Sequence, residues 1–257
     1  MQLGVCASTA SVDGLVPGAA DFVEENVQSF LVPEEPDAVF VEKLRAVTVP
    51  VRAANGFLPG TLKCVGPAVD QPRLLRYAES AFLRAQQAGI GIIVFGSGNA
   101  RQVPARFDPA RALEQFVALV RQLGPLAQRH GLVVAVEPLG RKECNFINSL
   151  AEGAAVVAAV AHPRVRLLAD TYHMAQEGES PEEIRRHGRW LAHVHVAEHE
   201  RRTAPGVAGD DFRPLFCALR AANYHGAVSV ECMWQDLKTQ LAGSLAGLRQ
   251  QWEETTC

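Results

Sequence analysis

The chain has 257 residues, which is longer than an average domain but within the range of the larger single-domain folds. Apolar residues make up 48% of it, charged residues 21%, and the formal net charge is −3, so the composition shows no bias toward nucleic acid or anionic membranes. The sequence does not start with a charged segment followed by a long apolar one, the pattern of a secretory signal. No apolar run in it approaches the roughly 20 residues that span a bilayer. We therefore expect a cytoplasmic protein whose partner is a small molecule, with no nucleic acid or membrane partner.

The cysteines of the chain are scattered and show no C-x-x-C spacing. Metal-binding and redox motifs place their cysteines close together in the sequence, so this spacing argues against both. The simplest interpretation is reduced thiols in an intracellular protein. The six residues are Cys6, Cys64, Cys144, Cys217, Cys232 and Cys257.

The first half of the chain alternates short apolar runs with helical patterns. Buried parallel strands are expected at residues 3–6, 20–24, 49–53 and 90–95, and helices at residues 37–46, 71–89 and 108–130. The last of these helices starts with Asp108 as cap and Pro109 in the first turn. Residues 7–18 are rich in Ser, Gly and Pro, so the first connecting helix is expected to be shortened.

In the second half, each of four apolar runs ends at a residue that can bind a metal. Residues 133–136 precede Glu137, residues 165–169 precede Asp170, residues 191–194 precede His195 and residues 228–230 precede Glu231. Helical patterns at residues 149–160, 181–187, 212–222 and 237–252 separate and follow these runs. Strands and helices thus alternate throughout.

Eight strands with intervening helices predict an α/β protein, a single (β/α)8 TIM barrel. They fill residues 1–257 as one domain and leave no segment for a second. The carboxyl ends of the strands of such a barrel meet at one face, where catalytic groups collect. The four metal-binding candidates would all project from that face.

Three carboxylates and an imidazole are suitable ligands for a divalent cation. Any one of them alone would be interpreted as a loop hydrogen-bonding residue, but carboxylates gathered without a cation would repel each other. His193 points the same way as His195 because side chains alternate along a strand, and we expect it to form hydrogen bonds in a lower layer of the barrel. Glu24 and Glu25, at the end of the second strand, are expected to be loop hydrogen-bonding residues, with contact to the substrate as the alternative.

These residues carry a resemblance to a known family. Residues 131–234 resemble the sugar isomerase and epimerase superfamily that shares the xylose-isomerase-like barrel, and within it the ketose 3-epimerases. The matching pieces are Glu137-Pro138 with Glu143 beyond it, Asp170-Thr171-Tyr172-His173, His193-Val194-His195 with Glu198 and Arg201 following, and Val230-Glu231.

The resemblance implies a metal site of Glu137, Asp170, His195 and Glu231, with Glu137 and Glu231 doubling as acid and base. It implies one divalent ion (Mn²⁺, Mg²⁺ or Co²⁺), a sugar or sugar-like substrate, and is compatible with a homo-oligomer. Substrate oxygens would be held by Glu143, His173 and Arg201, although the adjacent Arg202 leaves that last choice open.

The leading hypothesis is therefore a metal-dependent isomerase or epimerase of a ketose or a related α-hydroxy-carbonyl compound. A dehydratase of an inosose-type ketone would use the same residues, and a sugar-binding barrel without catalysis is a third hypothesis. Nucleases of the superfamily carry additional histidines on earlier strands, whereas the first 129 residues here contain none, which argues against that activity.

Overall fold

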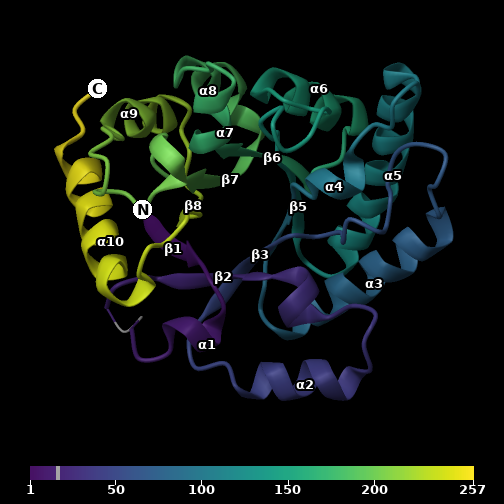
Figure 1. Ribbon diagram of the computed structural model, residues 1–257, viewed down its shortest axis with the longest axis horizontal. Helices are drawn as coiled ribbons and strands as arrows, with labels where there is room; N and C mark the ends of the chain where they lie inside the picture. Colours follow the sequence, from purple (N-terminus) through teal and green to yellow (C-terminus); the bar gives the residue numbers. More distant parts are fainter. Residues whose placement is uncertain (16–17) are drawn as a thin grey trace.

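The computed structural model describes residues 1–15 and 18–257. Its strands are all parallel and form a closed barrel in chain order, which confirms the predicted (β/α)8 fold (Figure 1). Pairing of the first strand with both the second and the eighth closes the ring. The strands are β1 (Gln2–Cys6), β2 (Phe22–Asn26), β3 (Val51–Asn55), β4 (Ile92–Phe95), β5 (Val133–Val136), β6 (Val165–Asp170), β7 (Leu191–Val196) and β8 (Ala227–Val230).

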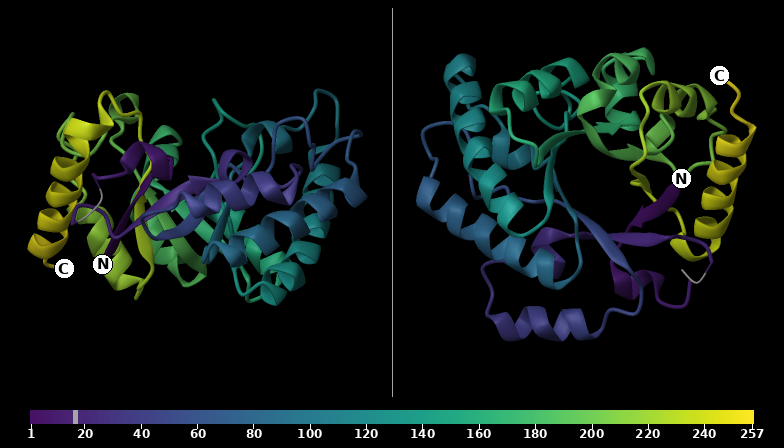
Figure 2. Two further views of the ribbon diagram at one scale, coloured as in Figure 1. Left: turned by 90° about the horizontal axis from the view of Figure 1, so that it is seen from below. Right: turned by 180° about the vertical axis from the view of Figure 1, so that it is seen from behind.

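Helices surround the barrel on its outside (Figure 2). The first, α1 (Thr9–Val12), has only four residues, so the predicted shortening is confirmed, although residues 16–17 of that connection lie outside the described part of the chain. The longer ones are α2 (Asp37–Arg45), α3 (Gln71–Gln87), α5 (Pro109–Arg129), α6 (Leu150–Val160), α9 (Arg213–Ala221) and α10 (Leu237–Glu254). Among the described residues, we find no helix with both the length and the apolar character needed to cross a bilayer.

Several short helical segments follow the strands. They are the π-helical turn Val27–Leu31, α4 (Gly98–Arg101), α7 (Thr171–Gln176), α8 (Glu182–His187) and two 3-10 turns, Gly188–Trp190 and Glu200–Arg202. The segment α7 begins directly after β6 because the side chain of Asp170 accepts hydrogen bonds from the backbone N–H groups of Tyr172 and His173. Most of these turns lie at the end of the barrel where the strands end, so they shape its mouth.

The interior of the barrel is chemically divided. On the side of β4, β5 and β6 it is filled by a small apolar cluster of Val94, Ala135 and Leu168, none of which is exposed. On the side of β7 and β8 the buried residues include His193 and Ser229, both also fully buried. Buried polar groups normally have hydrogen-bond partners. His193 and Ser229 must therefore find theirs inside the barrel.

The register of the strands sets candidate ligands side by side. Asp170 at the end of β6 pairs with His195 of β7, and Glu231 follows β8 with its backbone N–H bonded to the carbonyl of Val196. Outside the barrel, α5 starts as predicted, with the Asp108 side chain accepting a hydrogen bond from the N–H of Ala110. The strand ends therefore place the candidate ligands at the mouth, and the short turns after them shape its rim.

One expectation about the cysteines is wrong. Cys217 of α9 and Cys257 at the C-terminus form a disulfide, with their Cα atoms 5.5 Å apart. The chain after α10 returns to α9, where Arg220 donates hydrogen bonds to the carbonyls of Trp252 (2.6 Å) and Thr255. Sequence spacing could not indicate this pair, which is 40 residues apart, and the other four cysteines are free thiols.

Candidate active site

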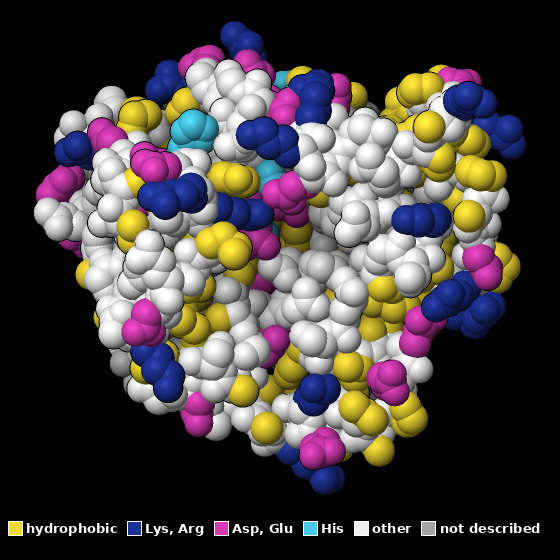
Figure 3. Space-filling model, viewed as in Figure 1, with side chains coloured by type: hydrophobic (Ala, Val, Ile, Leu, Met, Phe, Trp, Pro, Cys, Tyr) yellow, Lys and Arg dark blue, Asp and Glu magenta, His cyan; other side chains and the backbone are white. Residues whose placement is uncertain are grey.

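The residues that end the last four strands converge at the mouth of the barrel. Glu137, Asp170, His195 and Glu231 each offer one ligand atom, and all four atoms lie within 4.8 Å of one another. The first three side chains are buried, and Glu231 is partly exposed. The structure thus brings together the four residues that the sequence suggested as ligands. Figure 3 shows this face hollowed near its centre, with acidic, basic and histidine side chains gathered around the hollow.

The unsatisfied atoms of this cluster fit a cation. Nδ1 of His195 lies 3.1 Å from Oε2 of Glu231 and 3.4 Å from Oε1 of Glu137. Neither Nδ1 of His195 nor Oε1 of Glu137 has a hydrogen-bond partner among the described residues, although both atoms are buried. Leaving such atoms without partners is costly, and a divalent ion between them would satisfy both.

A glycine makes room for one of these carboxylates. Gly96 follows β4, and a Cβ atom at this position would clash with Oε2 of Glu137. A residue with a Cβ atom at position 96 would displace the Glu137 carboxylate from its position. Gly96 thus has a packing role next to the site.

The charges of the cluster are strongly coupled. Burial raises the pKa of Glu137, and the neighbouring carboxylates of Glu231 and Asp170 add to this effect. Burial also opposes ionisation of Glu231, but His195 and Arg202 outweigh it and hold the pKa of that carboxyl at about 2. Burial would lower the pKa of His195, yet the carboxylates of Glu24 and Glu231 raise it well above its usual value. The cluster is therefore a site of concentrated negative charge that favours a cation.

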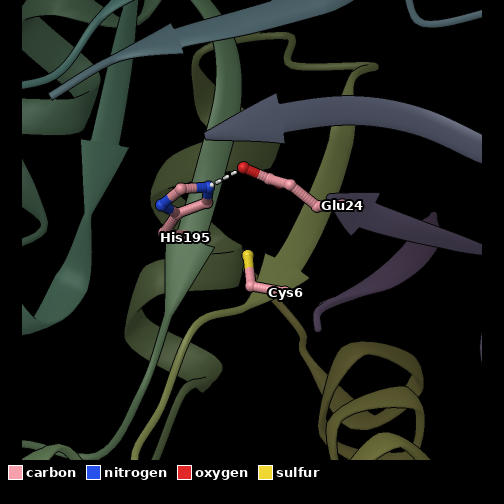
Figure 4. A group of neighbouring side chains, drawn as sticks. All are labelled: Cys6, Glu24 and His195. Carbon is pink, nitrogen blue, oxygen red and sulfur yellow. Dashed lines mark hydrogen bonds and ion pairs between the residues drawn. The ribbon is translucent and has the colours of Figure 1, made fainter. Parts of the chain in front are cut away.

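Glu24 of β2 holds the other side of His195 (Figure 4). Its Oε1 lies 2.9 Å from Nε2 of His195, and its Oε2 lies 2.7 Å from Nε2 of His193, which is also 3.1 Å from Oγ of Ser229. A carboxylate on the far nitrogen fixes the orientation of a metal-binding imidazole. The expectation for His193 is confirmed.

The loop role expected for Glu24 is wrong. This side chain is 1% exposed and lies inside the barrel, on the same side of β2 as Phe22, because side chains alternate along a strand. β2 continues to Asn26, two residues beyond its expected end, so Glu24 belongs to the strand and not to the loop. For Glu25 the expectation is confirmed, since its carboxylate accepts a hydrogen bond from the N–H of Thr9 (2.6 Å).

Arg202, and not Arg201, reaches the cluster. Nη2 of Arg202 lies 2.9 Å from Oδ2 of Asp170 and also contacts Oε2 of Glu231, while its guanidinium lies 4.9 Å from the centre of the Tyr172 ring. The Arg201 side chain is 80% exposed and, among the described residues, forms an ion pair with Glu200 alone. Both arginines have positive φ angles, 55° and 54°, and this left-handed turn reverses the direction expected for them. The structure therefore brings Arg202, and not Arg201, into contact with the cluster.

Glu198 stabilises the loop that carries this turn. The carboxylate is fully buried and accepts hydrogen bonds from the N–H groups of Gly206 (2.8 Å) and Gly209 (2.9 Å) and from the hydroxyl of Thr203 (2.9 Å). Burial opposes its ionisation, but these backbone donors lower its pKa. The strained turn at Arg202 is held by the folded loop behind it.

The remaining substrate-binding candidates lie at the rim of the cluster. Nε2 of His173 lies 3.7 Å from Oδ2 of Asp170 and 3.9 Å from Oε2 of Glu143. His173 is 4% exposed, whereas the Glu143 side chain is 46% exposed. His173 and Glu143 thus extend from the buried cluster toward the open mouth.

A cavity of about 250 Å³ adjoins the cluster on the side of β1, β2 and β3. Asn55, at the end of β3, borders it and donates a hydrogen bond from Nδ2 to Oε1 of Glu231 (2.8 Å). Sequence reasoning missed Asn55 because Asn55-Gly56 is typical of a turn. The residues that line the cavity are Cys6, Ala7, Ser8, Glu24, Glu25, Asn26, Ser29, Asn55 and Glu231.

Comparison with known proteins gives the same family. The model of the Xylose isomerase-like TIM barrel family matches residues 20–251. The chain is 37% identical over 199 residues to 3-dehydro-D-guloside 4-epimerase of Escherichia coli. This match covers 73% of this chain and 74% of that protein. It is 35% identical over 125 residues to D-psicose 3-epimerase of Agrobacterium fabrum, a match that covers 48% of this chain and 42% of the relative.

Solved structures share the fold over nearly the whole chain. D-psicose 3-epimerase from Clostridium cellulolyticum, solved with D-tagatose, superposes with a TM-score of 0.84 at 20% identity and covers all of both chains. The 3-keto-D-glucoside 4-epimerase from E. coli gives a TM-score of 0.79 at 24% identity and covers 97% of this chain and 99% of that one. The closed parallel barrel and the match over residues 20–251 show that this chain belongs to the xylose isomerase-like TIM barrel family.

Proposed function

We propose that the protein is a divalent-metal-dependent epimerase or isomerase of a keto sugar. The observation that carries this proposal is the cluster of two glutamates, one aspartate and one histidine whose ligand atoms lie within 4.8 Å of one another. The epimerases named among its relatives act on sugars that bear a carbonyl group, which supports the same class of substrate.

Glu137, Asp170, His195 and Glu231 would hold the metal. When bound there, a divalent ion supplies Lewis-acid polarisation of the substrate carbonyl and stabilises negative charge on its oxygen. Three carboxylate ligands favour a hard cation such as Mn²⁺, Mg²⁺ or Co²⁺. Glu24 keeps the imidazole of His195 in the orientation that turns Nδ1 toward this cluster.

Glu137 and Glu231 would perform the proton transfers. One carboxylate removes the proton from the carbon next to the carbonyl, and the resulting enediolate is protonated by the other from the opposite face, which inverts the centre. The two side chains come from different strands, so a substrate between them would meet one on each side. If one carboxylate served both steps across two carbons, the product would be an isomer and not an epimer.

Arg202, His173 and Glu143 would orient the substrate. Arg202 can donate to oxygens near Asp170 and Glu231, and His173 and Glu143 border the same mouth. Asn55 fixes the carboxylate of Glu231 through its own hydrogen bond. These residues would act on the substrate and on the acid/base groups without forming the metal site.

The function is tested by exchange of carbon-bound hydrogen with solvent deuterium. The purified protein loaded with Mn²⁺ would be incubated in D₂O with a panel of ketoses, ketose phosphates, 3-keto glycosides and an inosose. We expect label at a carbon next to the carbonyl of one class, together with its epimer. An unsaturated product with loss of water would identify a dehydratase instead. No exchange with any member of the panel, in protein shown to contain metal, would contradict the proposal.

A further inference from the structure

A second group of potential ligands lies on the opposite edge of the His195 ring. Sγ of Cys6, a carboxylate oxygen of Glu24 and a nitrogen of His195 lie within 4.8 Å of one another. Figure 4 shows the three side chains pointing toward a common space from β1, β2 and β7. Glu24 and His195 are almost completely buried, and Cys6 is a partly buried free thiol.

The chemistry of this group differs from that of the four-residue cluster. A thiolate, an imidazole and one carboxylate are ligands that zinc and similar thiophilic ions accept, whereas the four-residue cluster offers three carboxylates and no sulfur. The cavity of about 250 Å³ beside β1, β2 and β3 is bordered by both Cys6 and Glu24. An ion can therefore reach the group from the barrel mouth, and water can complete its coordination.

We propose that Cys6, Glu24 and Nε2 of His195 form a second cation site, which binds a thiophilic divalent ion such as Zn²⁺ or Cd²⁺. Binding displaces the proton of the Cys6 thiol to solvent and uses the lone pair on Nε2 of His195. The ring proton of His195 then lies on Nδ1, where Oε2 of Glu231 is 3.1 Å away to accept it. Glu24 can keep its contact with His193 through its other oxygen.

The shared histidine makes the two cation sites compete. A neutral imidazole has one nitrogen with a free lone pair, so His195 serves either Nδ1 toward Glu137 and Glu231 or Nε2 toward Cys6 and Glu24. Occupation of the thiol site withdraws the only nitrogen ligand from the four-residue cluster. A soft cation at Cys6 would thus inhibit the protein by holding the wrong tautomer of His195.

Cadmium titration of the metal-free protein tests the site itself. Bonding of a thiolate to Cd²⁺ produces a charge-transfer band in the ultraviolet. We expect this band to saturate at one Cd²⁺ per chain, to be lost in Cys6→Ser and to persist in Cys232→Ser, which removes another partly buried free thiol. Absence of the band in the unmodified protein, or a band of equal size in Cys6→Ser, would overturn the proposal. Circular dichroism would confirm that both variants are folded.

Competition tests the sharing of His195, and this arm rests on the proposed metal-dependent function. Saturation with Mn²⁺ before the titration should shift the Cd²⁺ midpoint to higher concentration, and Cd²⁺ should release Mn²⁺ that is detected by its solution EPR signal. In the Cys6→Ser variant, the same addition of Cd²⁺ should release much less Mn²⁺. A Cys6-dependent band whose midpoint is unaffected by bound Mn²⁺ would overturn the shared-ligand model. Failure of Mn²⁺ to bind at all would instead contradict the proposed function.

Discussion

The two halves of the barrel contribute different chemistry to its mouth. At or next to the carboxyl ends of strands β5 to β8 lie Glu137, Asp170, His195 and Glu231, the groups that would bind a cation and move protons. Strands β1 to β3 contribute Glu24 and Asn55, which contact these groups from behind or from the side. The comparison teaches that reactive groups and the groups that orient them come from separate halves of one ring, so substitutions in each half should have separable effects.

The largest effect is expected when a ligand from the second half is removed. Asp170→Asn and His195→Ala should abolish stoichiometric Mn²⁺ binding and turnover, with losses beyond the roughly 10–100-fold that changes behind the ligands produce. Metal content after dialysis, measured by elemental analysis, checks this. His225→Ala, an exposed histidine, is the control. Full metal content in both site variants would show that the halves are not divided in this way.

The two neighbouring arginines test the geometry of the loop after β7. Arg202→Ala should lose about 2.7 to 4 kcal/mol of transition-state stabilisation, as is found when one donor to a developing charge is removed. Arg201→Ala should behave like the unmodified protein because its side chain is 80% exposed. Metal content should stay intact in both, since neither arginine is a ligand. A severe defect in kcat for Arg201→Ala alone would mean that Arg201, and not Arg202, reaches the site.

A smaller effect is expected from the orienting half of the barrel. Glu24→Gln should weaken Mn²⁺ binding by roughly 10–100-fold, because the amide cannot accept hydrogen bonds from both His193 and His195. Isothermal titration calorimetry of the metal-free protein measures this. Glu25→Gln is a matched control, since Glu25 is also buried but bonds to Thr9. Equal Mn²⁺ affinities for the two variants would show that Glu24 does not support metal binding.

The smallest expected effect is on the pH dependence of the unfolding free energy. It involves Glu179, which lies after β6 in the second half of the barrel. Burial raises the pKa of Glu179, which accepts the backbone N–H of Leu150, from 4.5 to about 7. Because the folded protein binds this proton more tightly than the unfolded chain, the contribution of Glu179 to stability is greatest at low pH. It falls as the pH rises from about 4.5 to about 7.

Glu179→Gln should therefore reduce the loss of unfolding free energy between about pH 5 and about pH 8. Urea denaturation at both pH values measures the change, with Glu182→Gln, a more exposed carboxylate, as control. An unchanged pH dependence in Glu179→Gln would contradict the assignment. A reduced pH dependence would locate part of the loss of stability at rising pH between α6 and the segment after α7.

The sequence predicts the strands well because parallel barrel strands are nearly continuous apolar runs. It does not predict the short turns after them, such as the π-helical turn at Val27–Leu31 or α7, because these depend on capping and loop closure. The start of α7 depends on the side chain of Asp170, for which the sequence pattern indicates only a metal-binding role. One carboxylate oxygen caps the helix while the other faces Arg202, a dual role that a linear pattern does not reveal.

The candidate site is predicted only in the half where each ligand follows a strand. The pattern does not reveal the role of Glu24 because β2 continues to Asn26, beyond its expected end, and it does not reveal Asn55 because its sequence is that of a turn. The choice between Arg201 and Arg202 depends on two left-handed residues, which the sequence Glu-Arg-Arg does not favour. The spacing of apolar runs identifies metal-ligand candidates at strand ends. Strand boundaries and backbone irregularities determine which other side chains reach these candidates.

The central claim, that two glutamates act from opposite sides of one substrate, is tested most directly by proton exchange in single variants. Glu137→Gln and Glu231→Gln each keep an oxygen but remove one proton acceptor. With metal content verified, NMR in D₂O would follow exchange of the carbon-bound proton starting from each epimer separately. The account predicts that epimerisation falls severely in both variants while exchange survives from opposite epimers. Exchange from the same epimer at comparable rates in both variants would contradict it and favour a single base.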